Sequence, residues 1–218
     1  MVWSANFAYA VGLICSDGSL SKDGRHIDFT SKDIEQIENF RKILKVNNKV
    51  RLKNSGSNRL KKYYSIQLGD VKLYRFLLSI GITANKSKTI YEVEIPDKYF
   101  IDYLRGEFDG DGYTCSFWSK EWKNSFILYL GFVSASEKYI NWLRYKIFTL
   151  FGEDGHIRRG GRTAYQLYFG KYASVRLIEK IYYKPNLIYL SRKKFKIDQS
   201  LGIIHEQARV AKLVDAQD

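Results

Sequence analysis

Two segments of the chain, 94 residues apart, carry the same pattern of small and acidic residues. The first reads YAVGLICSDGSL over residues 9–20, and the second reads YLRGEFDGDGYT over residues 103–114. Asp17 and Asp111 take equivalent places in these segments, and a glycine follows each of them. A repeat of this length predicts two halves that share one architecture, which constrains the fold more than any other feature of the sequence.

The residues that follow each motif repeat in the same order. Alternation of polar and apolar residues, as in RHIDFTS (25–31) and FILYLGFVSAS (126–136), predicts a β-hairpin after each motif. Thr30 and Ser134, each three residues before an acid, resemble helix caps, and apolar residues then recur with helical spacing. A second hairpin, turning at 54–58 and 160–161, and a further helix, at 70–80 and 173–183, complete each half. The sequence therefore predicts helix–hairpin–helix–hairpin–helix, twice.

The glycine–aspartate run does not fit a calcium-binding EF-hand. A loop that began at Asp109 would need an acid or amide, a glycine and a glutamate where Tyr113, Thr114 and Lys120 stand. A helix that ends in glycine is ordinary, but a carboxylate at that end opposes the helix dipole. Because the chain makes this unfavourable choice twice, at equivalent positions, the aspartates indicate a function.

Small residues spaced by four predict that the two motif helices pack closely together. They are Gly12 and Ser16 in the first helix, and Gly106 and Gly110 in the second. Such packing would bring Asp17 and Asp111 together, and two close carboxylates repel unless cations bind. Mg²⁺ takes oxygen ligands and keeps several waters, which leaves room for phosphates.

The charge of the chain favours a polyanionic partner. It has 36 Lys and Arg against 23 Asp and Glu, a formal net charge of +13, and both halves share the excess. The two cysteines have no zinc-like spacing, and neither a membrane span nor a secretory signal is visible. We therefore expect no membrane partner and no secretion, and the two cysteines fit a reducing cytosol.

The runs AVGLICSDG (10–18) and LRGEFDGDG (104–112) resemble the LAGLIDADG motif, and the chain resembles a single-chain LAGLIDADG homing endonuclease over roughly residues 5–200. Cys15 stands where the first acid of the motif is usual, but the second acid is intact as Asp17 and Asp111. The resemblance implies an α+β fold of two pseudo-symmetric αββαββα halves, 1–96 and 97–204, whose antiparallel sheets form a saddle for duplex DNA. Residues 205–218 lie beyond the repeat and receive no role.

The resemblance also implies a monomeric, site-specific enzyme that recognises a long pseudo-palindromic site, hydrolyses both DNA strands and leaves short 3′ overhangs. Its compartment would be a bacterial cytoplasm or an organellar matrix. Asp17 and Asp111, with the backbone carbonyl of Ser16 or Gly110, would hold Mg²⁺, with Mn²⁺ as a substitute and Ca²⁺ binding without supporting cleavage. A basic residue would accompany each metal. Lys86 and Lys193 are our choices, while Lys88, Arg192 and Lys194 stay open, as does a role limited to the DNA backbone.

Sequence reading would lie on the hairpins, where Arg and Gln suit base edges and Lys suits phosphates. The expected DNA-binding residues are Arg25, Arg51, Lys53, Arg59, Lys62, Ser119, Lys120, Lys123, Arg158, Arg159, Arg162 and Gln166. Two other functions remain open at this point. One is an RNA maturase that binds intron RNA, and the other is a DNA-binding regulator that does not cleave.

Overall fold

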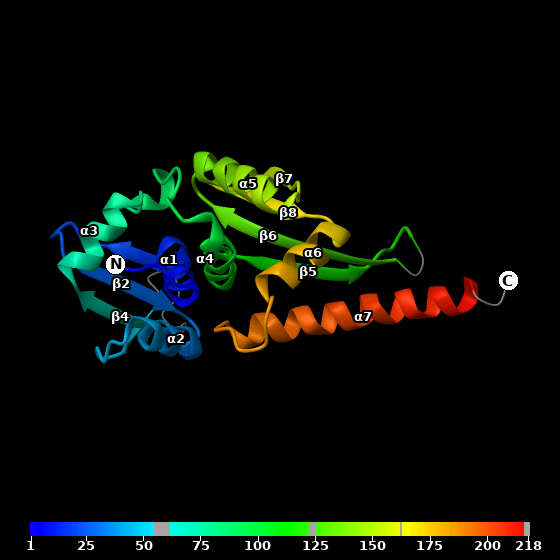
Figure 1. The fold of residues 1–218 in the computed structure, drawn as a ribbon, viewed down its shortest axis with the longest axis horizontal. Coiled ribbons are helices and arrows are strands. Elements are labelled where there is room, and N and C mark those ends of the chain that lie inside the picture. The colour runs from blue at the N-terminus through cyan, green and yellow to red at the C-terminus, as the bar shows by residue number, and fades with distance from the viewer. Residues whose placement is uncertain (55–61, 123–124, 162, 216–218) are drawn as a thin grey trace.

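A computed structural model of the protein describes residues 1–54, 62–122, 125–161 and 163–215. Each half begins with a motif helix and continues through two β-hairpins that a helix separates (Figure 1). The two halves lie side by side, and the motif helices α1 and α4 meet between them. The predicted α+β fold of two similar halves is confirmed.

The elements follow one another in matching order in the two halves. The first half contains α1 (Ala5–Asp17), β1 (Gly18–Leu20), β2 (His26–Ser31), α2 (Ile34–Leu44), β3 (Arg51–Asn54), β4 (Lys62–Gly69), α3 (Val71–Ser79) and the short 3-10 turn η1 (Lys86–Lys88). The second contains α4 (Asp97–Gly110), β5 (Tyr113–Trp118), β6 (Phe126–Ser134), α5 (Glu137–Phe151), β7 (His156–Gly160), β8 (Ala164–Phe169), α6 (Lys171–Ile181) and α7 (Ser191–Asp215).

Each half forms a four-stranded antiparallel sheet with the same strand order, β1-β2-β4-β3 in the first and β5-β6-β8-β7 in the second. Buried residues alternate along the strands, so that one face of each sheet covers the core. In the first sheet Phe29 pairs with Ile66, and in the second Leu130 pairs with Phe169, all of them buried. The side chains on the opposite face of the first sheet are less buried, as the alternation along β2 shows.

The centre of the protein is the contact between α1 and α4. Every residue of α1 from Phe7 to Cys15 is buried, which explains why this helix has almost no polar face. On α4 the apolar residues Phe100, Tyr103, Leu104 and Phe108 are fully buried. Both helices run directly into a strand, α1 into β1 and α4 into β5. The ends of the motif helices therefore lie between the two sheets.

The expected helix caps are wrong by two to three residues. Thr30 lies in β2 and Ser134 in β6, because each strand continues further than the sequence suggested. The helix α2 begins after Asp33, and α5 begins after Ser136, whose hydroxyl accepts a hydrogen bond from the amide of Tyr139. Strand pairing takes Thr30 and Ser134, so the helices begin later, and of the two residues at the new starts only Ser136 caps its helix through its side chain.

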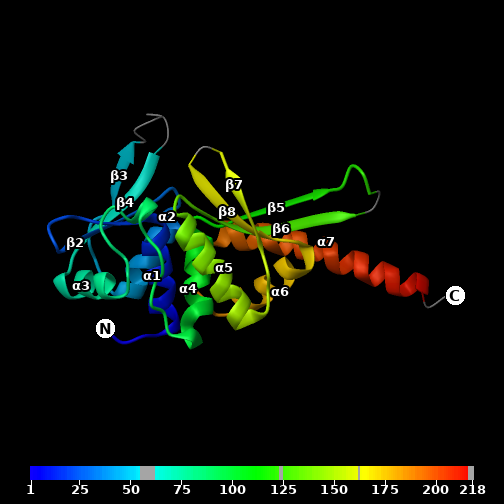
Figure 2. The ribbon, with the colours of Figure 1, turned by 90° about the horizontal axis from the view of Figure 1, so that it is seen from above.

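The last helix, α7, is much longer than the sequence indicated. It runs 25 residues from the basic segment through the expected boundary at 204/205 without a break. Figures 1 and 2 both show it extending along β5 and β6. Its Ile197 is fully buried, Lys196 donates to the carbonyl of Thr114 at 2.7 Å, and Ser200 lies 3.1 Å from the hydroxyl of Ser116.

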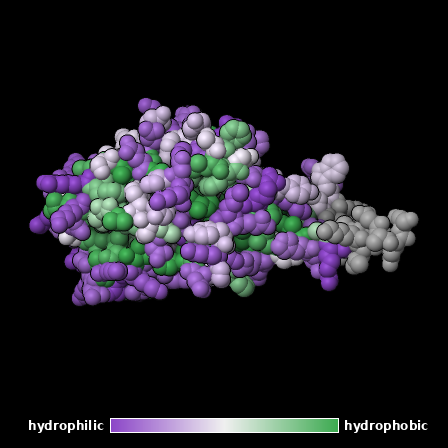
Figure 3. Space-filling view, in the orientation of Figure 1, coloured by the Kyte–Doolittle hydropathy of each residue, from purple (hydrophilic) through white to green (hydrophobic). Residues whose placement is uncertain are grey.

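The molecular surface seen in Figure 3 is mostly hydrophilic, with small hydrophobic areas scattered among polar side chains. Among the helices that the structure describes, none is both long and apolar enough to cross a membrane.

Candidate active site

The motif helices approach each other so closely that only glycine fits at their crossing. A Cβ atom on Gly12 would lie 2.3 Å from the carbonyl oxygen of Tyr103, and one on Gly106 would lie 2.2 Å from that of Tyr9. Both obstacles are backbone atoms of the partner helix, which a rotamer change cannot move. These two glycines therefore set the distance between the halves.

The two aspartates stand where the paired helices end. Asp17 is the last residue of α1, and Asp111 caps α4. A Cβ atom on Gly110 would lie 1.9 Å from the hydroxyl of Ser16 and 3.2 Å from a carboxylate oxygen of Asp17. Each helix end thus packs against its counterpart, and Asp17 lies beside the backbone of the other half.

Two pockets flank these helix ends, one for each aspartate. The Asp17 pocket, about 500 Å³, is lined by Asp17, Gly110, Lys193 and residues of β2 and α2. The Asp111 pocket, about 200 Å³, is lined by Asp111, Ser16, Lys86 and Glu107. In each pocket an aspartate of one half faces the motif backbone and the lysine of the other half. The sequence did not predict this crosswise arrangement.

Desolvation raises the pKa of both aspartates. Burial raises the pKa of Asp17 to about 7, and the charge of Asp111 adds to the rise, while Lys193 and Lys86 oppose it. Desolvation also raises the pKa of Asp111, against the charges of the same two lysines. A cation between the carboxylates would remove the repulsion and favour their ionised forms.

The two chosen lysines reach the ends of the motif helices. Lys193 Nζ donates to the carbonyl oxygens of Phe108, Gly110 and Gly112 at 2.5, 2.9 and 2.6 Å. Lys86 Nζ is buried and donates to the carbonyl oxygen of Gly18 at 2.5 Å. Each ammonium therefore neutralises the negative end of a helix dipole. Burial lowers the pKa of Lys193 to about 8.

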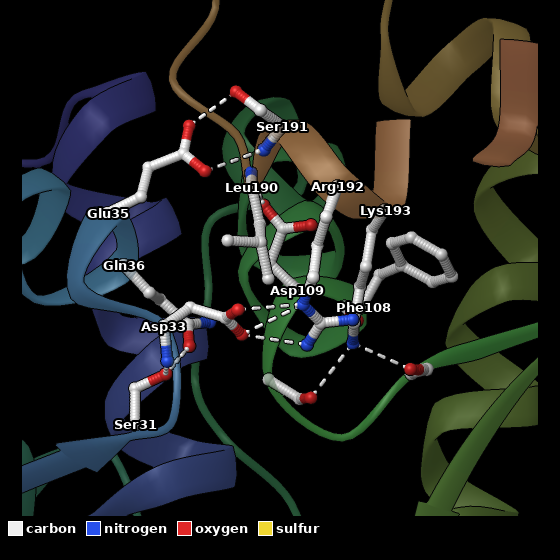
Figure 4. Close-up of polar contacts among 12 residues, drawn as sticks. Ser31, Asp33, Glu35, Gln36, Phe108, Asp109, Leu190, Ser191, Arg192 and Lys193 are labelled. Carbon is white, nitrogen blue, oxygen red and sulfur yellow. Dashed lines mark hydrogen bonds and ion pairs between the residues drawn. The ribbon is translucent and has the colours of Figure 1, made fainter. Parts of the chain in front are cut away.

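Residues of both halves fix Lys193 in place (Figure 4). The buried carboxylate of Asp109 accepts hydrogen bonds from the hydroxyl of Tyr9 and the amide of Leu190, both at 2.8 Å. Next to Leu190, Ser191 bonds to Glu35 of α2, and Arg192 forms a two-pronged ion pair with Asp33. The start of α7 is thus fastened to α4 and to the first half.

Arg192 and Lys194, left open by the sequence, are engaged elsewhere. Arg192 pairs with Asp33 at 2.8 Å, and Lys194 forms an ion pair with Asp198 one turn further along α7. In the first half, Lys88 is exposed while Lys86 is buried. Of the basic residues considered, Lys86 and Lys193 are the two that contact the motif backbone.

The residues around the aspartates fit a hard divalent cation. The available donors are carboxylate and carbonyl oxygens, and because Gly110 has no side chain, Asp17 and Ser16 can approach its backbone closely. No cluster of three or more His, Cys, Asp or Glu residues with metal-binding geometry occurs in the described parts of the chain. Such a site leaves several positions to water or phosphate, as Mg²⁺ prefers.

In the first sheet, the expected DNA-binding residues divide between two faces. Arg51 and Lys53 are exposed on β3, and the register places Lys53 beside Tyr63 on the open face. Lys62 pairs with Asn54 and lies on the other face, the one that carries the buried Ile66 and Leu68 further along β4. Lys62 is therefore not on the open face with Lys53. Arg25 is exposed in the turn before β2.

In the second sheet, Arg158 and Arg159 lie on opposite faces. Arg158 pairs with Gln166 on the open face and donates to its side-chain oxygen at 2.9 Å. Arg159 pairs with Tyr165 on the side of the helices, so the two arginines cannot read one groove together. Ser119 and Lys120 lie in the loop after β5, and Lys120 is exposed. Arg59, Lys123 and Arg162 lie outside the described residues.

Comparison with known proteins rests on structure, because no protein-family profile and no curated protein matches the chain. The whole chain aligns with 68% of full-length DUF199/WhiA from Thermatoga maritima, at 15% identity and a TM-score of 0.62. Over 91% of its length it aligns with 88% of the N-terminal LAGLIDADG domain of DUF199/WhiA, at 18% identity and a TM-score of 0.56. The chain has the LAGLIDADG fold.

Two homing endonucleases share this LAGLIDADG fold with the chain. The structure of I-WcaI bound to its DNA recognition sequence aligns with 89% of this chain, and the alignment covers 88% of the I-WcaI chain. The identity is 14% and the TM-score is 0.60. The structure of I-DmoI in complex with DNA and Mn aligns with 83% of this chain, and the alignment covers 98% of the I-DmoI chain. The identity is 16% and the TM-score is 0.53. At these identities the likeness establishes the fold alone.

Glu107 is a buried acid that the sequence analysis did not single out. It is 4% exposed, and burial raises its pKa to about 8. The equivalent residue of α1, 94 positions earlier, is the buried Leu13. The sequence signal for this residue is the difference between the two motifs at one position, where the first has Leu13 and the second has Glu107.

Replacing Glu107 with leucine is expected to stabilise the metal-free protein, and to do so more as pH rises. A carboxyl with a raised folded-state pKa favours folding only while it is protonated, so wild-type stability is lost between about pH 4.5 and 8. One pKa unit is worth about 1.4 kcal/mol, which predicts a melting-temperature gap that widens by roughly 5 °C or more from pH 5 to pH 8.5. Thermal melts in EDTA measure it, and a gap that is the same at both pH values contradicts it.

Proposed function

We propose that the protein is a site-specific endonuclease that hydrolyses both strands of duplex DNA at a long, partly palindromic site. The net charge of +13 is shared by both halves, which suits a DNA duplex whose phosphate backbone contacts both of them. Arg51 and Lys53 in one sheet, and Arg158 and Gln166 in the other, suit contacts with the two half-sites.

One observation carries this proposal. The ends of two pseudo-equivalent helices form two pockets, and each pocket combines an aspartate of one half with the motif backbone and the lysine of the other. Two strands of DNA need two such centres, close together and related by approximate symmetry. A protein that only binds DNA gains nothing from two adjacent carboxylates that repel each other.

The chain's own groups divide the chemistry between them. Asp17 with the Gly110 carbonyl, and Asp111 with the Ser16 carbonyl, would hold one divalent cation each or share one. When bound, the cation orients a water molecule and neutralises charge on the phosphoryl group. Lys193 and Lys86 place positive charge at the same helix ends, which attracts the scissile phosphates. No side chain needs to form a covalent bond with DNA.

A DNA-binding regulator without cleavage activity is the second candidate. It is favoured by the contact of Lys193 with the carbonyl of Gly110 at 2.9 Å, because an ammonium there already satisfies an oxygen that a cation would use. Lys193 would then balance the two aspartates permanently.

The test is incubation of the protein with a randomised duplex library in Mg²⁺, and in parallel in Ca²⁺, followed by recovery of both retained duplexes and new ends. We expect retention in both ions and defined ends only in Mg²⁺. If the protein retains one specific sequence but produces no cut ends in Mg²⁺ or Mn²⁺, the endonuclease proposal is wrong and the regulator becomes the better candidate. Ends at random positions would show cleavage without the proposed specificity.

A further inference from the structure

Glu107 is an acid of the Asp111 pocket that the motif repeat does not explain. It lines this pocket together with Asp111, Ser16 and Lys86. The equivalent residue of α1 is Leu13, which is not among the residues that line the Asp17 pocket. The acids beside Asp17 are instead Asp33 and Asp109, so the two pockets take their additional carboxylates from different positions.

One oxygen of the Glu107 carboxylate has no partner in the protein. The residue is 4% exposed, and its Oε1 has no hydrogen-bond partner among the described residues. Side-chain hydrogen bonds with Cys15 and Tyr139 lower the pKa of the Glu107 carboxyl against the larger effect of burial, but they leave Oε1 unpaired. A buried oxygen without a partner costs about 1–3 kcal/mol.

Glu107 and Asp111 stand four residues apart at the end of one helix. The amide of Asp111 donates to the carbonyl of Glu107 at 3.0 Å, so the α-helical turn between them is intact. Side chains at this spacing point from the same helix face, with Cβ atoms about 5–6 Å apart. A hydrated ion bound to Asp111 would have its water shell within reach of Glu107, because Mg²⁺ and Mn²⁺ retain waters in such sites.

We propose that Glu107 accepts a hydrogen bond from the water shell of a divalent cation at Asp111, and so strengthens cation binding in this pocket. The inference rests on the proposed function, which requires a cation at each aspartate. Glu107 is then a positioning residue that acts through bound water rather than as a direct ligand. The unpartnered Oε1 becomes satisfied when the ion binds. Its raised pKa agrees with a carboxyl that lacks a cation.

The experiment is a Mn²⁺ titration of the full-length protein without DNA, with free ion counted by electron paramagnetic resonance. Asp17→Asn leaves the Asp111 pocket intact, and Asp111→Asn leaves the Asp17 pocket intact. Loss of an outer-shell carboxylate commonly weakens metal binding about 10–100-fold. We expect Glu107→Gln to weaken Mn²⁺ binding by that amount in the Asp17→Asn background and to change nothing in the Asp111→Asn background.

Glu107→Leu, which copies the first half, serves as the second variant and should behave as Glu107→Gln does. Circular dichroism confirms that each variant is folded. Equal Mn²⁺ affinity with and without Glu107 in the Asp17→Asn background overturns the inference and leaves the proposed function standing. If wild type binds no Mn²⁺ at all, both the inference and the cation sites of the proposed function are wrong.

Discussion

Replacing Asp111 with asparagine is expected to lower the cleavage rate of at least one DNA strand by about 10³-fold while leaving binding within a few-fold. Asparagine keeps the shape of the side chain but removes the charge that would hold a cation. A bound cation is worth several kcal/mol in such a reaction, and each ~1.4 kcal/mol corresponds to a factor of ten in rate. The measurement is single-turnover cleavage of a duplex labelled separately on each strand.

Asp154→Asn is the matched control for this variant. Asp154 is also an aspartate, but it is exposed and forms an ion pair with Arg144 of α5. Its replacement should leave both strand rates unchanged. Normal double-strand cleavage by the Asp111→Asn protein would refute the assignment of Asp111 to a metal site.

Gly106→Ala is expected to cost about 3 kcal/mol of unfolding free energy, the upper end of what overpacking usually costs. The added Cβ would lie 2.2 Å from the carbonyl oxygen of Tyr9, so α1 and α4 must move apart and the core between them must open. For a chain of this length the change corresponds to a fall in melting temperature of roughly 6–12 °C. Denaturant and thermal unfolding both measure it.

The control is a glycine in a helix with free space around it. Gly202 lies in α7, and a Cβ atom there would meet nothing within 4 Å. Gly202→Ala should therefore stabilise the protein by about 1 kcal/mol through helix propensity alone. If Gly106→Ala unfolds at the same denaturant concentration as wild type, the close contact of the two motif helices is wrong.

The repeat carried most of the fold information, because symmetry turns one weak pattern into two that support each other. Gly12 and Gly106 were predictable as contact residues, since small residues at helical spacing serve few other purposes in a buried helix. Strand ends and helix caps were less predictable. Thr30 and Ser134 look like caps locally, but pairing with a neighbouring strand, which local sequence does not encode, claims them.

The contents of the pockets depend on contacts between distant segments. Lys193 reaches Gly110 only because Asp109 holds the amide of Leu190, and because Asp33 and Glu35 anchor the adjoining residues. Nothing within one segment of sequence reveals that chain of contacts. The same holds for Arg158 and Arg159, whose faces follow from the register of β7 against β8.

The two halves are similar in backbone and different in chemistry. Asp109 in the second motif anchors α7 through Leu190, while the equivalent Cys15 in the first motif contacts the hydroxyl of Tyr103. Glu107 lines the Asp111 pocket, while the equivalent Leu13 is buried and does not line the Asp17 pocket. The two pockets therefore differ in the side chains that they present, although the backbone around them is similar.

The most direct test of the endonuclease proposal is to map, at nucleotide resolution, the ends that the protein produces on both strands of its selected duplex in Mg²⁺. We predict one cut on each strand, offset across the minor groove to leave short 3′ overhangs. We also predict that replacing both Asp17 and Asp111 with asparagine abolishes the two cuts together. Specific binding with no cut on either strand in Mg²⁺ or Mn²⁺ would contradict the proposal.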